Sequence, residues 1–270
     1  MPMTSGEAGA YAAFARETAI AAGALILPHF RVALDVADKG ADGEPYDPVT
    51  VADRAAEALI RDRISHAYPG HGIRGEEHGW QKGRSNCTWV IDPIDGTRSF
   101  ILGQLHWATL IALNDGERIV AGVAYQPFVG ESFAAADGEA WWQRGAERRR
   151  LATRRCPALS DAVLAGTDPG MFRAAGTLDA FDRVAAQVRL RRWGGDCYCY
   201  CLLAMGLIDV VIESSLHAYD VQALIPIVEA AGGVMTDWSG NRCDEGGSVV
   251  ACGDRALHEQ VLTLLSRCDS

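Results

Sequence analysis

The segment at residues 89–97 constrains this chain most, because it joins a strand pattern to a turn that carries two acids. Its sequence is Trp-Val-Ile-Asp-Pro-Ile-Asp-Gly-Thr. The apolar run predicts a buried strand that ends at Asp92, and the proline predicts a turn that places Asp95 three residues further along. A short helix is expected to begin at Gly96-Thr97 and to continue through Phe100. Carboxylates at a strand end, beside exposed backbone N–H groups, suit hard cations that bind oxygen and hold a phosphate.

Two other turns carry acids of the same kind. Asp47 and Asp53 flank the start of an expected helix, and Glu76-Glu77 follows a glycine. A phosphate does not approach so many carboxylates unaided, so a divalent cation must reverse the local charge, and Mg²⁺ is the natural choice. Taken singly, these acids could be helix caps, a solvated pair or turn residues. That structural interpretation must explain three separate acidic turns, and the joint pattern therefore favours a metal site.

The acidic composition of the chain limits its partners. The formal net charge is −10 over 270 residues, which argues against nucleic acid because such partners select clustered lysine and arginine. The densest basic run, Arg148–Arg150, is expected to be a solvated loop. No apolar stretch approaches the roughly 20 residues that cross a bilayer, the richest being Ala19–Leu27, and residues 1–9 lack the pattern of a secretory signal. We therefore expect a cytoplasmic protein without a membrane partner.

The cysteines raise the question of zinc. All eight are expected to be reduced thiols, because a chain of this length without a secretory signal does not depend on disulfides. Cys197, Cys199 and Cys201 alternate with tyrosines, and a zinc site is the alternative there. If the segment is helical, residues two apart diverge by about 200° and do not share one metal. We expect these cysteines to be small buried core residues.

The apolar periodicity changes along the chain from helical to strand-like. Helical spacing predicts an opening helix around Tyr11–Leu25 and a second from Ala52 to Ile64, with a Gly/Asp/Pro-rich loop at 39–48 between them. Strands are expected at Gly72–Gly75, Thr88–Ile91, Trp107–Leu113, Arg118–Tyr125, Glu131–Ala135, Ala140–Gln143, Ala162–Gly166, Arg189–Arg192, Asp209–Ile212 and Ser248–Ala251. Further helices are expected at Leu178–Val188, Asp196–Ala204, Asp220–Ala231 and Arg255–Leu265.

This order of elements predicts the fold class. Runs of strands with irregularly interleaved helices indicate a layered α/β or α+β fold and not a strict βαβ repeat. We expect one unit over residues 1–270 that divides into halves at 1–150 and 151–270, which share one active site. The stretch Arg144–Leu159 is the expected seam between the halves.

Three ordered motifs resemble those of the inositol-monophosphatase-like phosphatases, which depend on Mg²⁺ and are sensitive to Li⁺. Gly-Glu-Glu stands at Gly75–Glu77, Asp-Pro-Ile-Asp-Gly-Thr at Asp92–Thr97, and Tyr219-Asp220 opens a helix that ends in Glu-Ala-Ala-Gly-Gly at Glu229–Gly233. The resemblance runs from about residue 10 to residue 265. It implies a layered αβαβα sandwich, a homodimer, a phosphomonoester substrate and two Mg²⁺ ions, with a third in some members.

The resemblance also implies roles for single residues. The ligands of the first metal match Glu76, Asp92 and the Ile94 carbonyl, and those of the second match Asp92, Asp95 and Asp220, while a third ion would use Glu76. Gly96 and Thr97 match the groups that hold phosphate. Thr97 and Asp53 match the pair that orients and deprotonates the attacking water, and Glu76 belongs to the catalytic set through its metal. His78 is expected to be peripheral and not a base.

The resemblance points to L-histidinol phosphate as substrate, with inositol 1-phosphate as the alternative. Arg98–Gly103, the segment Trp193–Tyr198 with Asp196, and the Tyr-Asp pair at 219–220 look like the histidinol-phosphatase branch. Only fourteen residues separate the Gly-Glu-Glu motif from Asp92, whereas nucleotidase-type members of the family that this chain resembles usually carry a longer insertion there, so the resemblance argues against a nucleotide. Histidinol phosphate carries an ammonium group and an imidazole, so an acid at Asp196 would pair with a cation, and Glu213 would add a second acidic contact. Asp196 has a second interpretation as the N-cap of the helix through Ala204.

A catalytically silent relative that binds metal or phosphate is the hypothesis from another class. Loss of a proposed metal ligand or of the water-activating pair would favour it. All of these residues are present: Asp53, Glu76, Asp92, Asp95, Thr97 and Asp220.

Overall fold

The computed structural model describes residues 6–33, 36–38 and 48–266. Within them the α-helices are α1 (Glu7–Ile26), α2 (Val51–Ala67), α3 (Thr97–Ile101), α4 (Pro169–Ala174), α5 (Leu178–Ala185), α6 (Asp196–Ala204), α7 (Ala218–Val221), α8 (Leu224–Ala230) and α9 (Arg255–Leu265). The strands are β1 (Val36–Asp38), β2 (Pro48–Thr50), β3 (Gly72–Gly75), β4 (Gly79–Gln81), β5 (Thr88–Asp95), β6 (Ala108–Asn114), β7 (Ile119–Gln126), β8 (Glu131–Ala136), β9 (Glu139–Arg144), β10 (Glu147–Arg150), β11 (Val163–Gly166), β12 (Leu190–Trp193), β13 (Val210–His217), β14 (Val234–Asp237) and β15 (Gly246–Cys252).

Two mixed sheets form the framework of the protein. The larger has eight strands in the order β10-β9-β8-β7-β6-β5-β3-β4, and all of its pairs are antiparallel except β3 with β5. The smaller has five strands in the order β12-β11-β13-β15-β14 and is parallel on one side of β13 and antiparallel on the other. β1 and β2 form a separate antiparallel pair.

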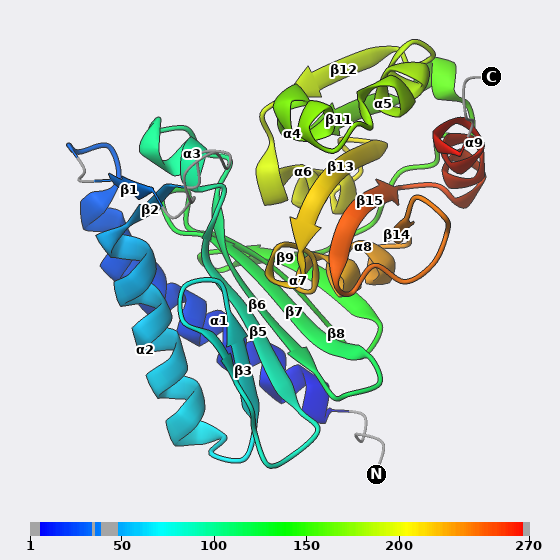
Figure 1. Ribbon diagram of the computed structural model, residues 1–270. Coiled ribbons are helices and arrows are strands. Elements are labelled where there is room, and N and C mark those ends of the chain that lie inside the picture. The colour runs from blue at the N-terminus through cyan, green and yellow to red at the C-terminus, as the bar shows by residue number, and fades with distance from the viewer. Residues whose placement is uncertain (1–5, 34–35, 39–47, 267–270) are drawn as a thin grey trace.

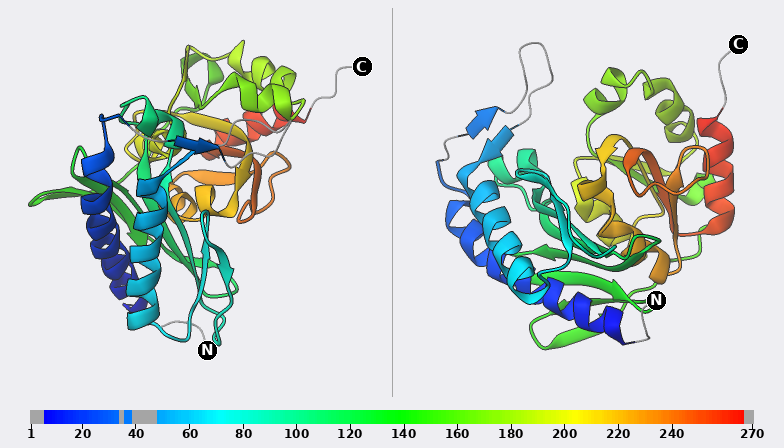
Figure 2. Two further views of the ribbon diagram at one scale, coloured as in Figure 1. Left: turned by 60° about the vertical axis from the view of Figure 1, so that its left-hand side comes forward. Right: turned by 60° about the horizontal axis from the view of Figure 1, so that its bottom comes forward.

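Helices cover both sheets in alternating layers, as Figures 1 and 2 show. α1 and α2 pack on one face of the larger sheet, α6 and α8 lie between the two sheets, and α5 and α9 cover the far side of the smaller sheet. Three apolar cores fill these three spaces. The order is therefore αβαβα, which confirms the predicted layered sandwich.

Strand periodicity explains why one sheet serves two cores. Successive side chains of a strand point to opposite faces. In β5, Trp89 and Ile91 lie in the core beneath α1 and α2, whereas Val90 lies in the core beneath α6 and α8. In β6, Leu110 lies in the core beneath α6 and α8, whereas Ile111 lies in the core beneath α1 and α2. Both faces are buried, so the central strands are apolar throughout.

The opening helix contradicts the expectation that no apolar stretch of this chain is long enough to cross a bilayer. α1 with the turn after it, residues 7–29, is long and apolar enough to cross a membrane by length and composition. Its buried alanines, among them Ala12, Ala15, Ala19 and Ala22, face the sheet, and α1 packs on β6, β7 and β8. We attribute its apolar character to this packing.

Several elements differ from the sequence predictions. The helix expected over Asp220–Ala231 is divided into α7 and α8, because Pro226 cannot donate a backbone hydrogen bond and is tolerated only in the first turn of a helix. The basic run Arg148–Arg150 is not a loop but the exposed edge strand β10, where Arg148 stacks on Trp141 and Arg149 on Trp142 of β9. The short elements β4, α4 and β14 were not expected. Most of the predicted loop at 39–48, including Asp47, lies outside the described residues.

Candidate active site

The end of β5 brings two acids to the same place. In a regular strand, residues three apart face opposite sides of the sheet. The pairing of β5 with β6 shifts register between Asp92 and Asp95, which turns the chain there. The backbone N–H of Ile94 donates to Oδ1 of Asp92 at 3.1 Å and holds this turn. Asp95 is fixed from the other half of the chain, because its Oδ2 accepts from the N–H of Cys197 at 2.9 Å.

A third acid joins them from α7. Oδ2 of Asp220 accepts from the N–H of His217 at 2.6 Å, at the start of that helix. Carboxylate oxygens of Asp92, Asp95 and Asp220 all lie within 4.8 Å of one another. In the described part of the chain this is the one group of three or more potential metal ligands with such geometry. Such a cluster of oxygen donors could hold a metal ion.

The electrostatics of the cluster favour a bound cation. Burial, and then the neighbouring charges of Glu76, Asp95 and Asp220, raise the pKa of Asp92 well above its usual range. Burial and then Asp95 raise the pKa of Asp220 in the same direction. The negative charges of these acids therefore repel one another, and a cation bound among them would offset that repulsion. Glu76 is outside the trio but close enough to act on Asp92.

Asp53 offers a partly free carboxylate beside this cluster. It is fully buried in the first turn of α2, and its Oδ2 accepts from the backbone N–H of Thr50 at 2.8 Å. Oδ1 is buried without a hydrogen-bond partner. Burial raises the pKa of Asp53 to about 6, which is a range suited to a general base. Asp53 also forms a capping box with Thr50 at the start of α2. It therefore caps the helix through Oδ2 and still presents Oδ1 as an acceptor.

Thr97 lies at the start of α3. Its hydroxyl donates to the Ile94 carbonyl at 3.1 Å and not to Asp53. Gly96 precedes it with a φ of 83°, and a Cβ there would fall 2.5 Å from the His106 carbonyl and 3.1 Å from Cβ of Asp196. Glycine is therefore required at position 96 both by the backbone and by the close approach of Asp196.

Asp196 is not the N-cap of α6, which corrects one of the two interpretations. Gly195 holds the N-cap position and Asp196 is the first helical residue, with a φ of 44°. Its Oδ2 accepts from the hydroxyl of Ser99 at 2.6 Å, and its N–H donates to the hydroxyl of Thr167 at 3.1 Å. Burial and then Asp95 raise the pKa of Asp196 to about 7. The side chain is thus directed at the α3 turn and not at its own helix.

Glu213 is a second acid on the same side, and unlike Asp196 it is fully buried. Its Oε1 accepts from the hydroxyl of Thr167 at 2.8 Å, while Oε2 is buried without a hydrogen-bond partner. Burial raises its pKa well above the usual range. Thr167 therefore links Glu213 to Asp196, and sequence reasoning missed it because it lies far from both along the chain.

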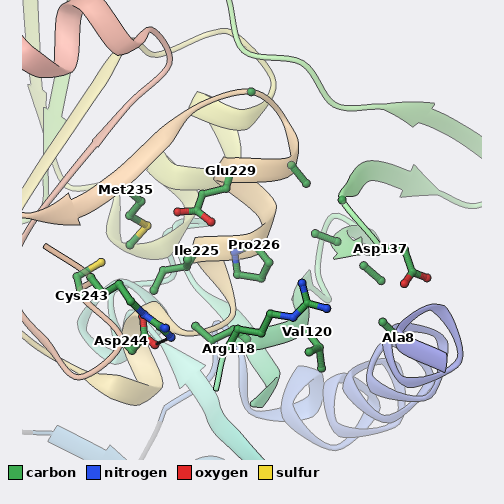
Figure 3. A pocket seen from close by; sticks show the side chains of 17 residues that line it. Ala8, Arg118, Val120, Asp137, Ile225, Pro226, Glu229, Met235, Cys243 and Asp244 are labelled. Atoms are coloured by element: carbon green, nitrogen blue, oxygen red, sulfur yellow. Dashed lines mark hydrogen bonds and ion pairs between the residues drawn. The ribbon is translucent and has the colours of Figure 1, made fainter. Parts of the chain in front are cut away.

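A cavity of about 570 Å³ brings most of these groups together, although Asp53 and Asp92 are not part of its lining. Its lining includes Glu76, Asp95, Gly96, Thr97, Thr167, Asp196, Glu213 and Asp220. A larger cavity of about 920 Å³ is lined by none of the predicted site residues. Figure 3 shows that apolar Ile225, Pro226 and Met235 and charged Arg118 and Glu229 are interspersed in its lining. The smaller cavity is therefore the candidate active site.

The remaining predicted groups take peripheral or core positions. His78 is exposed, with its Nδ1 3.4 Å from Oε1 of Glu57. Cys197, Cys199 and Cys201 are buried free thiols in the core between the sheets, as predicted. Burial raises the pKa of each of these thiols. They are therefore not prepared to bind zinc as thiolates.

Comparison with known proteins identifies the family. The profile of the inositol monophosphatase family matches residues 9–270. The chain is 39% identical over 266 residues to the bifunctional phosphatase IMPL2 of Arabidopsis thaliana, covering 94% of this chain and 75% of that protein. It is 36% identical over 230 residues to the histidinol-phosphatase of Streptomyces coelicolor, covering 82% and 84%. The structure of an inositol monophosphatase from Zymomonas mobilis superposes with a TM-score of 0.85 at 37% identity, covering 97% of this chain and 99% of that one. The chain belongs to the inositol monophosphatase family and is a phosphatase of that family.

Proposed function

We propose that this protein is a Mg²⁺-dependent phosphomonoesterase that hydrolyses L-histidinol phosphate to L-histidinol and phosphate. The observation that carries the substrate assignment is that Asp196 and Glu213 line the same cavity as Asp95 and Asp220 of the acidic cluster. A neutral polyol has no cationic group that would form an ion pair with these acids. The alternative substrate is inositol 1-phosphate.

The acidic cluster fits Mg²⁺ by its chemistry. Mg²⁺ prefers hard oxygen ligands and is usually held by a few carboxylates together with substrate phosphate. Asp92, Asp95 and Asp220 supply such oxygens, and their raised pKa values reflect charges that a cation would neutralise. We propose that these three, with Glu76 and the Ile94 carbonyl, hold two Mg²⁺ ions, and that a third would depend on Glu76.

The chain's own residues would then position the reactants. Bound Mg²⁺ supplies a water of lowered pKa and neutralises charge on the phosphate. The unpartnered Oδ1 of Asp53 would accept a proton from the attacking water, and the hydroxyl of Thr97 would orient that water. The backbone at Gly96 and Thr97 would bind phosphate oxygens.

Asp196 and Glu213 would recognise the cationic end of the substrate. Both carboxylates retain acceptor capacity, since each is held through one oxygen by a hydroxyl. An ammonium or imidazolium group would favour their charged forms and offset the burial that raises their pKa values. Relatives at similar identity carry both names, histidinol-phosphatase at 36% and inositol monophosphatase at 37%. Identity alone therefore does not select the substrate, and the cavity acids support the choice.

The oligomeric state, the cellular location and the kinds of partner stay predictions. We propose that the protein is a homodimer and that it acts in the cytoplasm, with no nucleic-acid or membrane partner. The silent-relative hypothesis is weakened because Asp92, Asp95 and Asp220 cluster and because Glu76, Asp95 and Asp220 line one cavity. None of these points enters the chemistry proposed above.

Asp196→Asn tests the substrate assignment. Asparagine tolerates the left-handed backbone and still accepts from Ser99, so the change removes mainly the charge. Loss of a charge-assisted hydrogen bond costs about 1.5–3 kcal/mol, so kcat/KM for histidinol phosphate should fall roughly 10- to 150-fold. Inositol 1-phosphate should lose little.

Asp168→Asn is the matched control. Asp168 lines the rim of the same cavity, pairs with Arg98 at 3.5 Å, and caps α4 through an oxygen that asparagine retains. It removes one negative charge without removing the proposed contact, and it should leave the substrate preference unchanged. Equal losses for both substrates in Asp196→Asn would contradict the assignment.

A further inference from the structure

A carboxylate outside the predicted site supports the turn that carries Glu76. Glu57 lies on α2, four residues and about one helical turn after Asp53. Its side chain is fully buried. A buried carboxylate requires charge and hydrogen-bond partners to offset its desolvation. The partners of Glu57 all involve the turn between β3 and β4.

The hydrogen bonds of Glu57 hold both residues that follow Glu76. The N–H of Glu77 donates to Oε2 at 2.7 Å, and the N–H of His78 donates to Oε1 at 3.1 Å. Backbone N–H groups in a tight turn lack partners within the turn, so a buried acceptor decides its shape. The Arg61 guanidinium donates from Nε to Oε1 at 2.7 Å and also bonds to the Gly79 carbonyl. Arg61 thereby fixes the carboxylate and the end of the turn together.

The residue that precedes Glu76 packs directly on the same carboxylate. A Cβ at Gly75 would fall 2.2 Å from Oε1 of Glu57. Glycine at this position lets the turn lie against the acid. Glu76 is therefore flanked on one side by this contact and on the other by the two hydrogen bonds. Its backbone position is set by Glu57.

We propose that Glu57 is a positioning residue that places Glu76 for metal binding and so sets the affinity for the ion that Glu76 completes. This inference rests on the proposed function, in which Glu76 is a Mg²⁺ ligand. α2 then supports two parts of the site from successive turns, the water-activating acid Asp53 and the support of the metal-binding turn. Glu57 does not touch the reacting atoms.

Glu57→Gln is the direct test. The amide of glutamine keeps one acceptor oxygen but replaces the other oxygen with an NH₂ donor. That donor would face either a backbone N–H or the Arg61 guanidinium, which are donors as well, so one hydrogen bond is lost. Partners that orient a metal ligand typically contribute 10- to 100-fold in metal affinity. We expect the Mg²⁺ concentration for half-maximal phosphatase activity to rise roughly 10-fold or more, while kcat at saturating Mg²⁺ stays close to the wild-type value.

Direct binding gives a readout that does not depend on the substrate. Mn²⁺ takes the same oxygen ligands as Mg²⁺, and its free ion is measured by electron paramagnetic resonance. One class of Mn²⁺ sites should weaken in Glu57→Gln by a similar factor. Glu57→Asp keeps the charge but shortens the side chain by one methylene, and its affinity should fall between wild type and Glu57→Gln. This variant also provides the comparison if Glu57→Gln fails to fold.

Asp209→Asn is the matched control. Asp209 is also fully buried and accepts from a backbone N–H, that of Val163 at 2.7 Å, and from Arg154 at 2.6 Å, but it lies just before β13 and does not line the cavity. It should lose stability without a change in Mn²⁺ affinity. Unchanged Mn²⁺ affinity in the Glu57 variants, or a loss equal to that of Asp209→Asn, would overturn the proposal. If wild type binds Mn²⁺ but releases no phosphate, the proposed function fails, and the binding comparison still decides the role of Glu57.

Discussion

Replacing Asp92 with asparagine is expected to remove phosphatase activity while leaving the fold intact. Asp92 is the most buried acid of the cluster and, in the proposed site, a ligand shared by both ions. Metal ions stabilise developing charge by several kcal/mol, so the loss in kcat should be at least about 10³-fold. Asparagine retains the acceptor for the Ile94 N–H. Without metal, the neutral side chain also relieves the repulsion that raises the pKa of Asp92.

The stability of this variant separates the two roles of the residue. In the presence of chelator, its thermal unfolding midpoint should equal or exceed that of wild type. A turn residue with only a structural role would show lower stability and retained turnover. Asp237→Asn is a suitable control, because Asp237 holds a turn by accepting from the N–H groups of Ser239 and Asn241 at 2.8 Å and is remote from the cavity. The Asp237→Asn variant should keep its phosphatase activity. Wild-type turnover of Asp92→Asn at saturating Mg²⁺ would contradict the metal-centred mechanism.

Replacing Thr97 with alanine is expected to give the second largest loss. The change keeps every carboxylate of the cluster but removes the hydroxyl beside the Ile94 carbonyl. A positioned acid–base group typically contributes a factor of about 10² to 10⁴, and we expect a loss in kcat of that size. Steady-state kinetics at saturating Mg²⁺ measures the loss, and Mn²⁺ binding should be largely retained.

Serine is the matched variant at this position. Thr97→Ser keeps the hydroxyl and loses only a methyl group, so most of the activity should return. If Thr97→Ala instead binds metal weakly and reaches wild-type kcat at saturation, Thr97 acts by holding the Ile94 carbonyl near the metal. The hydrogen bond from Thr97 to the Ile94 carbonyl is compatible with this second role, and the two measurements distinguish it from orientation of the attacking water.

Local pattern was enough to predict most of the elements and a layered α/β or α+β class, whereas the αβαβα order was implied by the family resemblance. The strand that ends at Asp92 and the short helix after Gly96 follow from apolar runs and turn residues, which act over a few positions. Their convergence with Asp220, more than a hundred residues later, is not contained in any local pattern. The family resemblance supplied it, and the structure shows the three acids within 4.8 Å of one another.

Features that depend on packing between distant segments could not be predicted in this way. Asp196 reads as an N-cap, but contacts with Ser99 and Thr167 draw it into the cavity from the first helical position. The sequence analysis did not single out Glu57, although its spacing of four from Asp53 places both on one face of α2. That spacing was the available signal. What it could not show is that the β3–β4 turn lies against that face.

Phosphate release by the wild-type protein tests the central claim most directly. L-Histidinol phosphate and inositol 1-phosphate would be compared at concentrations below KM, with Mg²⁺, with chelator, and with Mg²⁺ restored. We predict that chelator abolishes release, that Mg²⁺ restores it, and that kcat/KM for histidinol phosphate exceeds that for inositol 1-phosphate by about 10-fold or more, the value of one charge-assisted contact. Release that persists in chelator, or a preference for inositol 1-phosphate, would contradict the account.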